Sequence, residues 1–207
     1  MVTAVKICGV TRNEDAQTAL RLGARALGFI FYAPSPRNVD VRRAAQIVRD
    51  LPPFVSAVGL FVNADENHIE NVLTQVPLDL LQFHGDEEPA FCARFRKPYI
   101  KAVRVRPQTD LLQYAGLHSA ARALLLDAFV DGTHGGTGTV FDWSLIPHDL
   151  PLPVILSGGL NAGNVADAIR RVGPWAVDVS SGVEATAGIK DPQKIAAFMR
   201  EVCSAVV

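Results

Sequence analysis

The 207-residue sequence lacks the features that mark several classes of protein. Its three cysteines are widely spaced and odd in number, which indicates neither a disulfide framework nor a zinc site and is typical of a reducing compartment. No apolar run reaches about 18 residues, and strand-forming residues follow the start directly. We therefore expect a cytoplasmic protein with neither a signal peptide nor a membrane span.

No excess of either charge is present. Twenty basic residues against 21 acidic ones give a net charge of -1, so the chain has no strong basic field that would attract nucleic acid or an anionic membrane. A hydrophobic content of 49% suffices for a full core, and no break in composition marks a linker. We expect a single domain over residues 1–207.

Short apolar runs alternate with amphipathic stretches along the whole chain. This alternation predicts an α/β protein with a parallel sheet. Eight such units favour a closed (β/α)8 TIM barrel over an open sheet, at the short end of the usual size range of about 200–400 residues. The predicted strands are residues 4–8, 26–31, 55–62, 78–83, 99–103, 123–126, 154–156 and 176–179.

Capping signals predict where several helices begin. Thr11 and Glu14 have the spacing of a capping box. Asp40 and Asp191 each precede an amphipathic stretch, and Asn161 is a candidate N-cap for the helix after the seventh strand.

Small residues follow the seventh and eighth predicted strands. The first of these turns contains Gly158 and Gly159, and the second contains Ser181 and Gly182. Neighbouring parallel strands that end in such turns present backbone N–H groups without obstructing side chains, which suits a phosphate group. In (β/α)8 barrels a phosphate site occupies this position. We therefore predict phosphate binding at these four residues.

Two reactive side chains end predicted strands. Cys8 is followed by Gly9, and its thiolate could act as a base or nucleophile if nearby N–H groups or cations stabilise it. Asp127 ends an apolar run, where apolar neighbours favour the protonated carboxyl group that a general acid needs. The simpler alternatives, a small packing residue for Cys8 and a loop or capping role for Asp127, stay open.

Other polar residues at strand ends have both structural and functional interpretations. His84 is either a structural histidine or a ligand-binding group, and Arg37 is either a surface charge or a bidentate partner for a carboxylate. The glycine-rich residues 135–138 match neither a P-loop nor a dinucleotide-binding motif. We interpret them as a mobile cover, and whether residues 131–139 close over a substrate is left open.

These strand ends also carry a family resemblance. In order and spacing, motifs along the whole chain are similar to those of the phosphoribosylanthranilate isomerase family of tryptophan biosynthesis. Phe83 and Ser157 replace a leucine and an alanine that are common in the family. The motifs are residues 6–9 (KICG), 28–31 (GFIF), 35–37 (SPR), 59–63 (GLFVN), 82–87 (QFHGDE), 126–127 (LD), 135–138 (GGTG), 141–143 (FDW), 158–160 (GGL), 164–165 (NV), 178–184 (DVSSGVE) and 188–191 (GIKD).

The resemblance implies an Amadori rearrangement of N-(5-phosphoribosyl)anthranilate to 1-(2-carboxyphenylamino)-1-deoxyribulose 5-phosphate, without a cofactor or metal. By the family pattern Asp127 is the general acid and Cys8 the general base. Arg37 would bind the anthranilate carboxylate, and His84 and Asp178 would line the pocket. The sequence leaves open whether the protein is a monomer or a homodimer and whether it accepts a related histidine-pathway substrate.

Three other functions are compatible with a phosphate-binding barrel. A metal-dependent phosphosugar epimerase needs His and Asp ligands at strand ends, and His84 is the one histidine at such a position. An indole-forming synthase would use lysines at strand ends and has no role for the Cys8 and Asp127 pair. A non-catalytic phosphosugar-binding barrel would keep the glycine turns without needing either residue.

Overall fold

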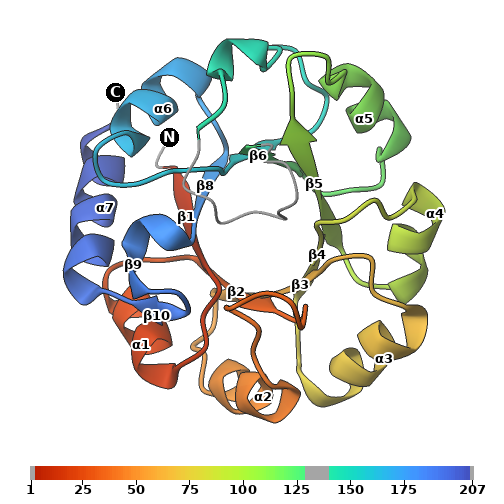
Figure 1. Cartoon of the computed structure of the whole chain (residues 1–207), viewed down its shortest axis with the longest axis vertical. Helices are drawn as coiled ribbons and strands as arrows, with labels where there is room; N and C mark the ends of the chain where they lie inside the picture. Colours follow the sequence, from red (N-terminus) through yellow and green to blue (C-terminus); the bar gives the residue numbers. More distant parts are fainter. Residues whose placement is uncertain (1–2, 129–139, 206–207) are drawn as a thin grey trace.

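The structure, a computed structural model, describes residues 3–128 and 140–205. Eight parallel strands form a closed barrel in which each strand pairs with the next and β8 pairs with β1 (Figure 1). This confirms the predicted (β/α)8 barrel. The strands are β1 (Ala4–Cys8), β2 (Ala26–Ile30), β3 (Ser56–Phe61), β4 (Leu80–Phe83), β5 (Tyr99–Val105), β6 (Leu124–Ala128), β7 (Val154–Leu156) and β8 (Ala176–Val179).

Helices surround the barrel on its outside (Figure 1). They are α1 (Asn13–Arg21), α2 (Val41–Arg49), α3 (Glu66–Gln75), α4 (Pro89–Cys92), α5 (Leu111–Leu117), α6 (Val165–Val172) and α7 (Pro192–Ser204). Shorter elements complete the described chain, and they are the 3-10 turns η1 (Ala93–Phe95), η2 (Trp143–Leu145) and η3 (Ser181–Val183) and the antiparallel pair β9 (Glu184–Thr186) and β10 (Ile189–Lys190). In residues 3–128 and 140–205 no helix has both the length and the hydropathy to cross a bilayer.

The strands bury both of their faces, as expected when helices cover a parallel sheet. Residues that face the helices pack with the inner helix faces into one large apolar cluster. Inside the barrel a second apolar cluster contains Val58, Ile100, Leu125 and Ile155. Further along the same strands, toward their carboxyl ends, the inward positions hold buried charged or polar groups, and these are Lys6, Gln82, Asp127 and Asp178.

Two predicted helix starts are wrong. Thr11 does not cap α1, because its hydroxyl donates to the backbone oxygen of Gly188 (2.6 Å) and Arg12 takes the N-cap position. Asn161 does not cap α6, which begins at Val165 after Asn164. The Asn161 side chain instead accepts from the Gly163 N–H (2.8 Å) within the preceding turn. Both side chains therefore stabilise loops rather than helix ends.

The predicted caps at Asp40 and Asp191 are confirmed. Each carboxylate accepts hydrogen bonds from two N–H groups in the first turn of its helix, α2 or α7. Such caps satisfy backbone donors that have no partner within the helix. They fix where the chain enters these two helices after the loops at the carboxyl ends of the strands.

Candidate active site

Four of the predicted site residues lie at the carboxyl ends of the strands. Cys8 ends β1, Asp127 lies in β6, Asp178 lies in β8, and His84 directly follows β4. All four are buried, with 4–6% of their surface exposed. Since side chains alternate between the two faces of a strand, Cys8 and Lys6 share the inward face of β1. Asp178 is the direct partner of Lys6 in the pairing of β1 with β8.

The Cys8 thiol lies in a small space beside Gly28. A β-carbon at position 28 would come within 2.7 Å of the Cys8 sulfur and 3.0 Å of the Lys6 Nζ, so glycine keeps room for both groups. Burial raises the pKa of Cys8 above its usual value, although the neighbouring Lys6 ammonium acts in the opposite direction. The thiol is therefore the main form at neutral pH in the unliganded protein.

Asp127 is held by two donors. Its Oδ1 accepts from the backbone N–H of Ala128 (2.9 Å), and its Oδ2 lies 3.1 Å from the Nε2 of His84. On the other side of the imidazole, the Nδ1 of His84 lies 2.9 Å from the amide nitrogen of Gln82. With that amide donating to Nδ1, the Nε2–H of His84 donates to Asp127. Gln82 lies in a motif at a predicted strand end but was not among the predicted site residues, although its inward position two residues before His84 was readable from the strand alternation.

The turn that carries His84 is fixed by a buried ion pair. The Lys101 ammonium donates to Glu87 Oε2 (2.8 Å) and to the Gly85 carbonyl (2.6 Å). The Glu87 carboxylate also accepts from the backbone N–H groups of Asn63 and Gly85. This network links the segments that follow β3 and β4 to β5. The role of Glu87 could not be predicted from its own segment, because Lys101 belongs to β5 and Asn63 follows β3.

Arg37 is engaged within the protein. Its Nε and Nη2 donate to the Glu184 carboxylate at 2.8–3.2 Å, and this carboxylate also accepts from the buried Lys190 (2.9 Å). Burial would raise the pKa of Glu184, but the hydrogen bond from Arg37 and the charge of Lys190 outweigh it, and the pKa is lowered. The pair leaves the Nη1 side of the guanidinium for other interactions. Glu184 and Lys190 were also missed as site residues.

The two glycine turns lie against each other. Gly158 and Gly159 have positive φ values of 82° and 65°, which favour glycine. A β-carbon on Gly158 would come within 2.5 Å of the Ala128 backbone nitrogen, and one on Gly182 would collide with the Leu160 carbonyl oxygen. The Gly159 carbonyl accepts from the Asn164 side chain (3.0 Å). Ser181 and Gly182 open η3, the short extra helix expected beside such a site.

An apolar wall forms another part of the site. Cys8 belongs to a small cluster with Ile30, Leu60 and Val62, and Tyr32 packs against it. These residues come from the ends of β2 and β3 and the segments that follow them. The glycine turns follow β7 and β8, on the other side of β1. The predicted cover over residues 131–139 lies outside the described residues.

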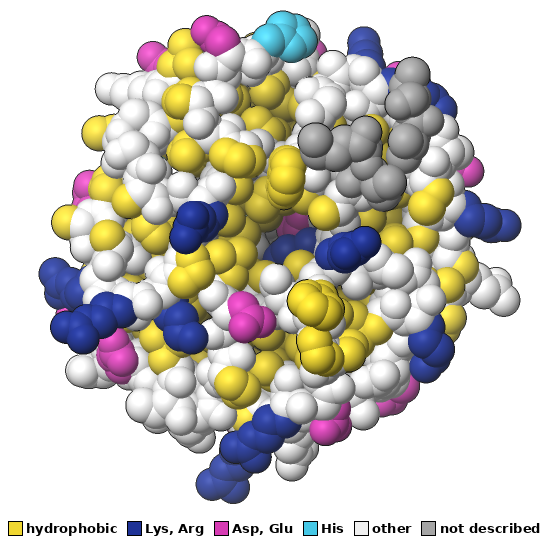
Figure 2. Space-filling model, turned by 180° about the vertical axis from the view of Figure 1, so that it is seen from behind, with side chains coloured by type: hydrophobic (Ala, Val, Ile, Leu, Met, Phe, Trp, Pro, Cys, Tyr) yellow, Lys and Arg dark blue, Asp and Glu magenta, His cyan; other side chains and the backbone are white. Residues whose placement is uncertain are grey.

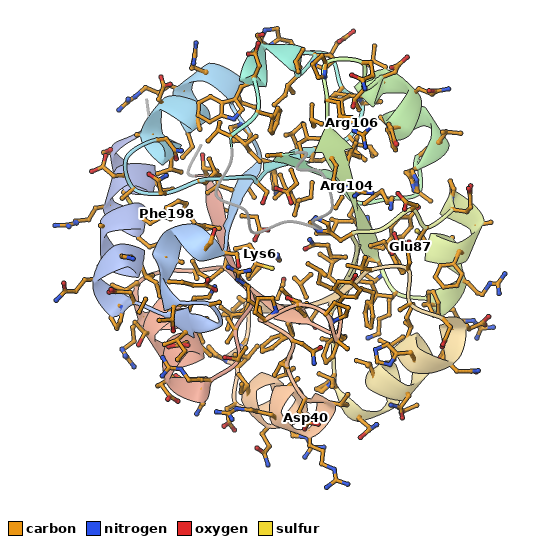
Figure 3. All side chains as sticks on the ribbon, viewed as in Figure 1. Lys6, Asp40, Glu87, Arg104, Arg106 and Phe198 are labelled. Carbon is orange, nitrogen blue, oxygen red and sulfur yellow. The ribbon has the colours of Figure 1, made fainter. Side chains whose placement is uncertain are left out.

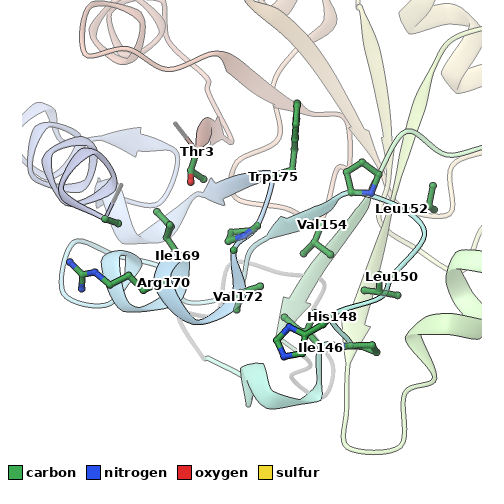
Figure 4. Close-up of a pocket in the computed structure, with 15 residues that line it drawn as sticks. Thr3, Ile146, His148, Leu150, Leu152, Val154, Ile169, Arg170, Val172 and Trp175 are labelled. Carbon is green, nitrogen blue, oxygen red and sulfur yellow. The ribbon is translucent and has the colours of Figure 1, made fainter. Parts of the chain in front are cut away.

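A separate pocket of about 620 Å³ lies near the amino ends of β7 and β8 (Figure 4). The residues that line it include Thr3, Val154, Ile169 and Trp175 but none of the predicted site residues.

The face opposite to that seen in Figure 1 has hydrophobic side chains exposed between Lys and Arg side chains (Figure 2). Within residues 3–128 and 140–205, no group of three His, Cys, Asp or Glu side chains is arranged to hold a metal ion.

Comparisons with known proteins agree with this geometry. The family model described as N-(5'phosphoribosyl)anthranilate (PRA) isomerase matches residues 5–201. The chain belongs to this family. It is 61% identical to the N-(5'-phosphoribosyl)anthranilate isomerase of Thiobacillus denitrificans, over 97% of this chain and 98% of that protein. The chain is therefore an isomerase, and the implied link to tryptophan biosynthesis is supported.

Solved structures of phosphoribosyl anthranilate isomerases have the same fold. The Thermotoga maritima structure is 41% identical with a TM-score of 0.89, over 98% of this chain and 99% of that one. Another, also 41% identical with a TM-score of 0.86 over the same shares, is a complex with reduced 1-(o-carboxyphenylamino)-1-deoxyribulose 5-phosphate. The Thermotoga maritima protein is dimeric, and monomers of it have also been solved. Membership in this isomerase family excludes the epimerase, synthase and non-catalytic alternatives.

Proposed function

We propose that this isomerase converts N-(5-phosphoribosyl)anthranilate to 1-(2-carboxyphenylamino)-1-deoxyribulose 5-phosphate. The order of groups around the barrel carries the proposal. Asp127 lies in β6 and Cys8 ends β1, and the two strands between them, β7 and β8, end in the glycine turns. A phosphate held by those turns would place a phosphosugar between a carboxyl group and a thiol. The solved relative in complex with a reduced 5-phosphate of this kind supports the same substrate class.

Two proton transfers, one from Asp127 and one to Cys8, begin the chemistry. Asp127 gives its proton to the ribose ring oxygen, the bond between this oxygen and C1 breaks, and the substrate nitrogen and C1 form an iminium ion. The Cys8 thiolate then removes the proton from C2, and the electrons of that C–H bond form the C1–C2 double bond while the iminium nitrogen regains its lone pair. The resulting enolamine tautomerises to the ketone. Because the iminium is itself an electron sink, positioned acid and base groups supply the required catalysis.

The productive ionisation state has the proton on Asp127 and not on Cys8. Burial raises the pKa of Cys8, so the thiolate is the minor form near neutral pH. Because Cys8 is buried, where the effective dielectric is lower than in water, its thiolate attracts the iminium charge that develops next to C2 more strongly. Since one group must carry a proton and the other must not, a bell-shaped activity profile is expected.

Binding follows from the same geometry. The backbone at Gly158, Gly159, Ser181 and Gly182 would hold the phosphate, and the apolar wall of Ile30, Leu60 and Val62 suits an aromatic ring. Arg37 has donors on Nη1 that the Glu184 pair does not use, and these would bind the anthranilate carboxylate. His84 and Asp178 would line the pocket. We further propose that residues 1–207 form one domain that acts as a monomer or a homodimer.

Asp127→Asn tests the role of the acid. Asparagine keeps the size and the acceptor oxygen but has no carboxyl proton, so turnover of freshly prepared phosphoribosylanthranilate should be abolished, with phosphate binding and Tm nearly unchanged. Asp86→Asn is the matched control, because Asp86 is an exposed carboxylate in the turn after β4. Substantial kcat in Asp127→Asn would contradict the acid role, and a large fall in Tm would show a structural role instead.

A further inference from the structure

Lys6 is a buried cation that the mechanism above does not use. Only 4% of its surface is exposed, and in Figure 3 it lies near the centre of the barrel, whereas Glu87 lies toward α4. Its Nζ donates to Asp178 Oδ1 at 2.8 Å. A buried charge is costly unless it is paired, so a lysine at an inward position two residues before Cys8 calls for an explanation beyond packing.

The Lys6 ammonium and the Cys8 sulfur are direct neighbours. Both lie within 3.0 Å of the point where a β-carbon on Gly28 would stand. Burial lowers the pKa of Lys6, but the charges of Asp178 and Cys8 and hydrogen bonds to both groups raise it to about 12. Lys6 therefore stays an ammonium group over the whole pH range in which an enzyme of this kind works.

We propose that Lys6 is a positioning residue that stabilises the Cys8 thiolate, and that Asp178 limits this effect by neutralising part of its charge. The inference rests on the proposed role of Cys8 as the base. A thiolate at the end of β1 gains a charge-assisted hydrogen bond from Nζ, and the same bond directs the sulfur toward the centre of the mouth. Gly28 is needed because any side chain there would occupy the space of both groups.

The charged groups around Cys8 come from four elements. Lys6 on β1 and Lys190 on β10 favour the thiolate, and Asp178 on β8 opposes it. Lys190 is also paired with Glu184 of β9, which Arg37 shares, so this carboxylate offsets only part of the two positive charges. The charge of Lys190 nevertheless lowers the pKa of Cys8 less than the charge of Lys6 does. On β2 the neighbour is Gly28, which has no charge. Lys6 is thus the cation with the most direct effect on the sulfur.

This arrangement predicts opposite effects for the two members of one ion pair. Lys6→Met removes the favourable charge and should raise the pKa of Cys8 by at least about one unit, the range expected for a charge in contact. Asp178→Asn keeps an acceptor for Nζ but removes the opposing negative charge, so it should lower the pKa of Cys8. Lys6→Arg keeps the charge and should stay closer to wild type than Lys6→Met.

The pKa of Cys8 is measured without turnover. The rate of alkylation by iodoacetamide is followed across pH by mass spectrometry of the Cys8 peptide, because only the thiolate reacts. Ultraviolet absorbance of the thiolate, as the difference between each variant and the same variant with Cys8→Ser, gives a value that does not depend on access. Below the pKa, Lys6→Met should be alkylated at least about tenfold more slowly than wild type.

Lys101→Met is the matched control. It removes another buried, ion-paired strand lysine, but on β5, across the barrel from Cys8. It should leave the pKa of Cys8 unchanged. An unchanged pKa in Lys6→Met, or a pKa shifted the same way by Lys6→Met and Asp178→Asn, would overturn the proposal. If Lys6→Met does not fold, a raised pKa in Asp178→Asn is sufficient to overturn it.

The effect of Lys6 on the Cys8 thiol can be measured independently of the proposed role of Cys8 as the base. If Cys8→Ser keeps its rate, Cys8 is not the base, yet the effect of Lys6 on the thiol would still be measured by alkylation. If Cys8 is the base and Lys6 stabilises its thiolate, kcat/KM of Lys6→Met should fall near neutral pH and recover as the pH rises. A uniform loss of kcat/KM at every pH would indicate a structural role for Lys6 and overturn the inference.

Discussion

Replacing Lys101 with Met removes one half of a buried ion pair and leaves the other half in place. The side chains of Lys101 and Glu87 are 3% and 2% exposed, and they meet at 2.8 Å. Truncating one partner of such a pair costs about 3–5 kcal/mol, because an uncompensated charge remains buried. Glu87 keeps its backbone donors at Asn63 and Gly85, which places the expected cost near the lower limit, at about 3 kcal/mol.

Thermal unfolding measures this cost. For a chain of this size each kcal/mol corresponds to roughly 2–4 °C, so Tm of Lys101→Met should fall on the order of 6–12 °C. The matched control is Arg94→Met, which breaks an exposed pair with Glu66 and should cost at most about 1 kcal/mol. Adding Glu87→Gln to Lys101→Met removes the unpaired charge but keeps an acceptor for the backbone donors, so part of the stability should return.

Activity gives a second measurement on the same variant. Lys101 also donates to the Gly85 carbonyl, next to His84, so its loss should displace the imidazole from Asp127 and lower kcat. Equal Tm values for Lys101→Met and Arg94→Met would refute the energetic reasoning. A large fall in Tm with unchanged kcat would refute the argument that this ion pair positions His84.

Cys8, Arg37 and His118 can each be tested by one substitution. Cys8→Ser should lower kcat at least about 10²-fold with little change in substrate binding, as measured in steady-state kinetics, and retention of more than half the rate would exclude the thiol as base. Arg37→Ala should weaken binding of a carboxylated product analogue in calorimetry but not binding of inorganic phosphate, and equal weakening of both would contradict the assignment. Burial lowers the pKa of His118 from 6.5 to about 4, so its neutral form contributes stability that is complete above pH 6.5 and is lost as the pH falls toward 4. His118→Phe should therefore flatten the dependence of Tm on pH in this range, and an unchanged dependence would exclude His118 as its source.

The barrel could be predicted because its signal is repeated eight times. Each apolar run of the sequence became a strand, and the differences concern strand ends. The fourth strand was predicted over residues 78–83 and is Leu80–Phe83, and the sixth was predicted over residues 123–126 and is Leu124–Ala128. Strand ends depend on the register with neighbouring strands, which hydrophobicity along one segment does not contain.

Helix starts were predictable where the cap is local. Asp40 and Asp191 bond to N–H groups two and three residues further on, so the sequence contains the whole interaction. Thr11 has the same local pattern but bonds to Gly188, on the opposite end of the chain. The Thr11 hydroxyl therefore bonds to a residue distant in sequence instead of to the first turn of its own helix, and the sequence near Thr11 does not indicate this partner.

In the site too, local features could be predicted from the sequence and tertiary partners could not. The position of a residue at a strand end was enough to group Cys8, His84, Asp127 and Asp178. Their partners could not be assigned, because the pairing of Lys6 with Asp178 or of Arg37 with Glu184 joins segments more than 140 residues apart. Arg37 illustrates the consequence. Its fork of donors was matched to a ligand carboxylate, whereas a carboxylate of the protein already occupies its Nε and Nη2.

The barrel interior is apolar near the amino ends of the strands and charged or polar near their carboxyl ends. The residues that stabilise the fold therefore lie apart from those that form the site. Near the amino ends of the strands the interior is filled by residues such as Val58 and Leu125, whose burial stabilises the fold. Toward the carboxyl ends the interior holds the buried pair Lys6–Asp178. Two further buried lysine–carboxylate pairs among the described residues, Lys101–Glu87 and Lys190–Glu184, stabilise the strands and loops around it. Buried pairs add little net stability, since the cost of removing both charges from water offsets their attraction. What each pair does is hold a loop or strand against a neighbour, so the apolar interior stabilises the barrel and the ion pairs set the geometry of its mouth.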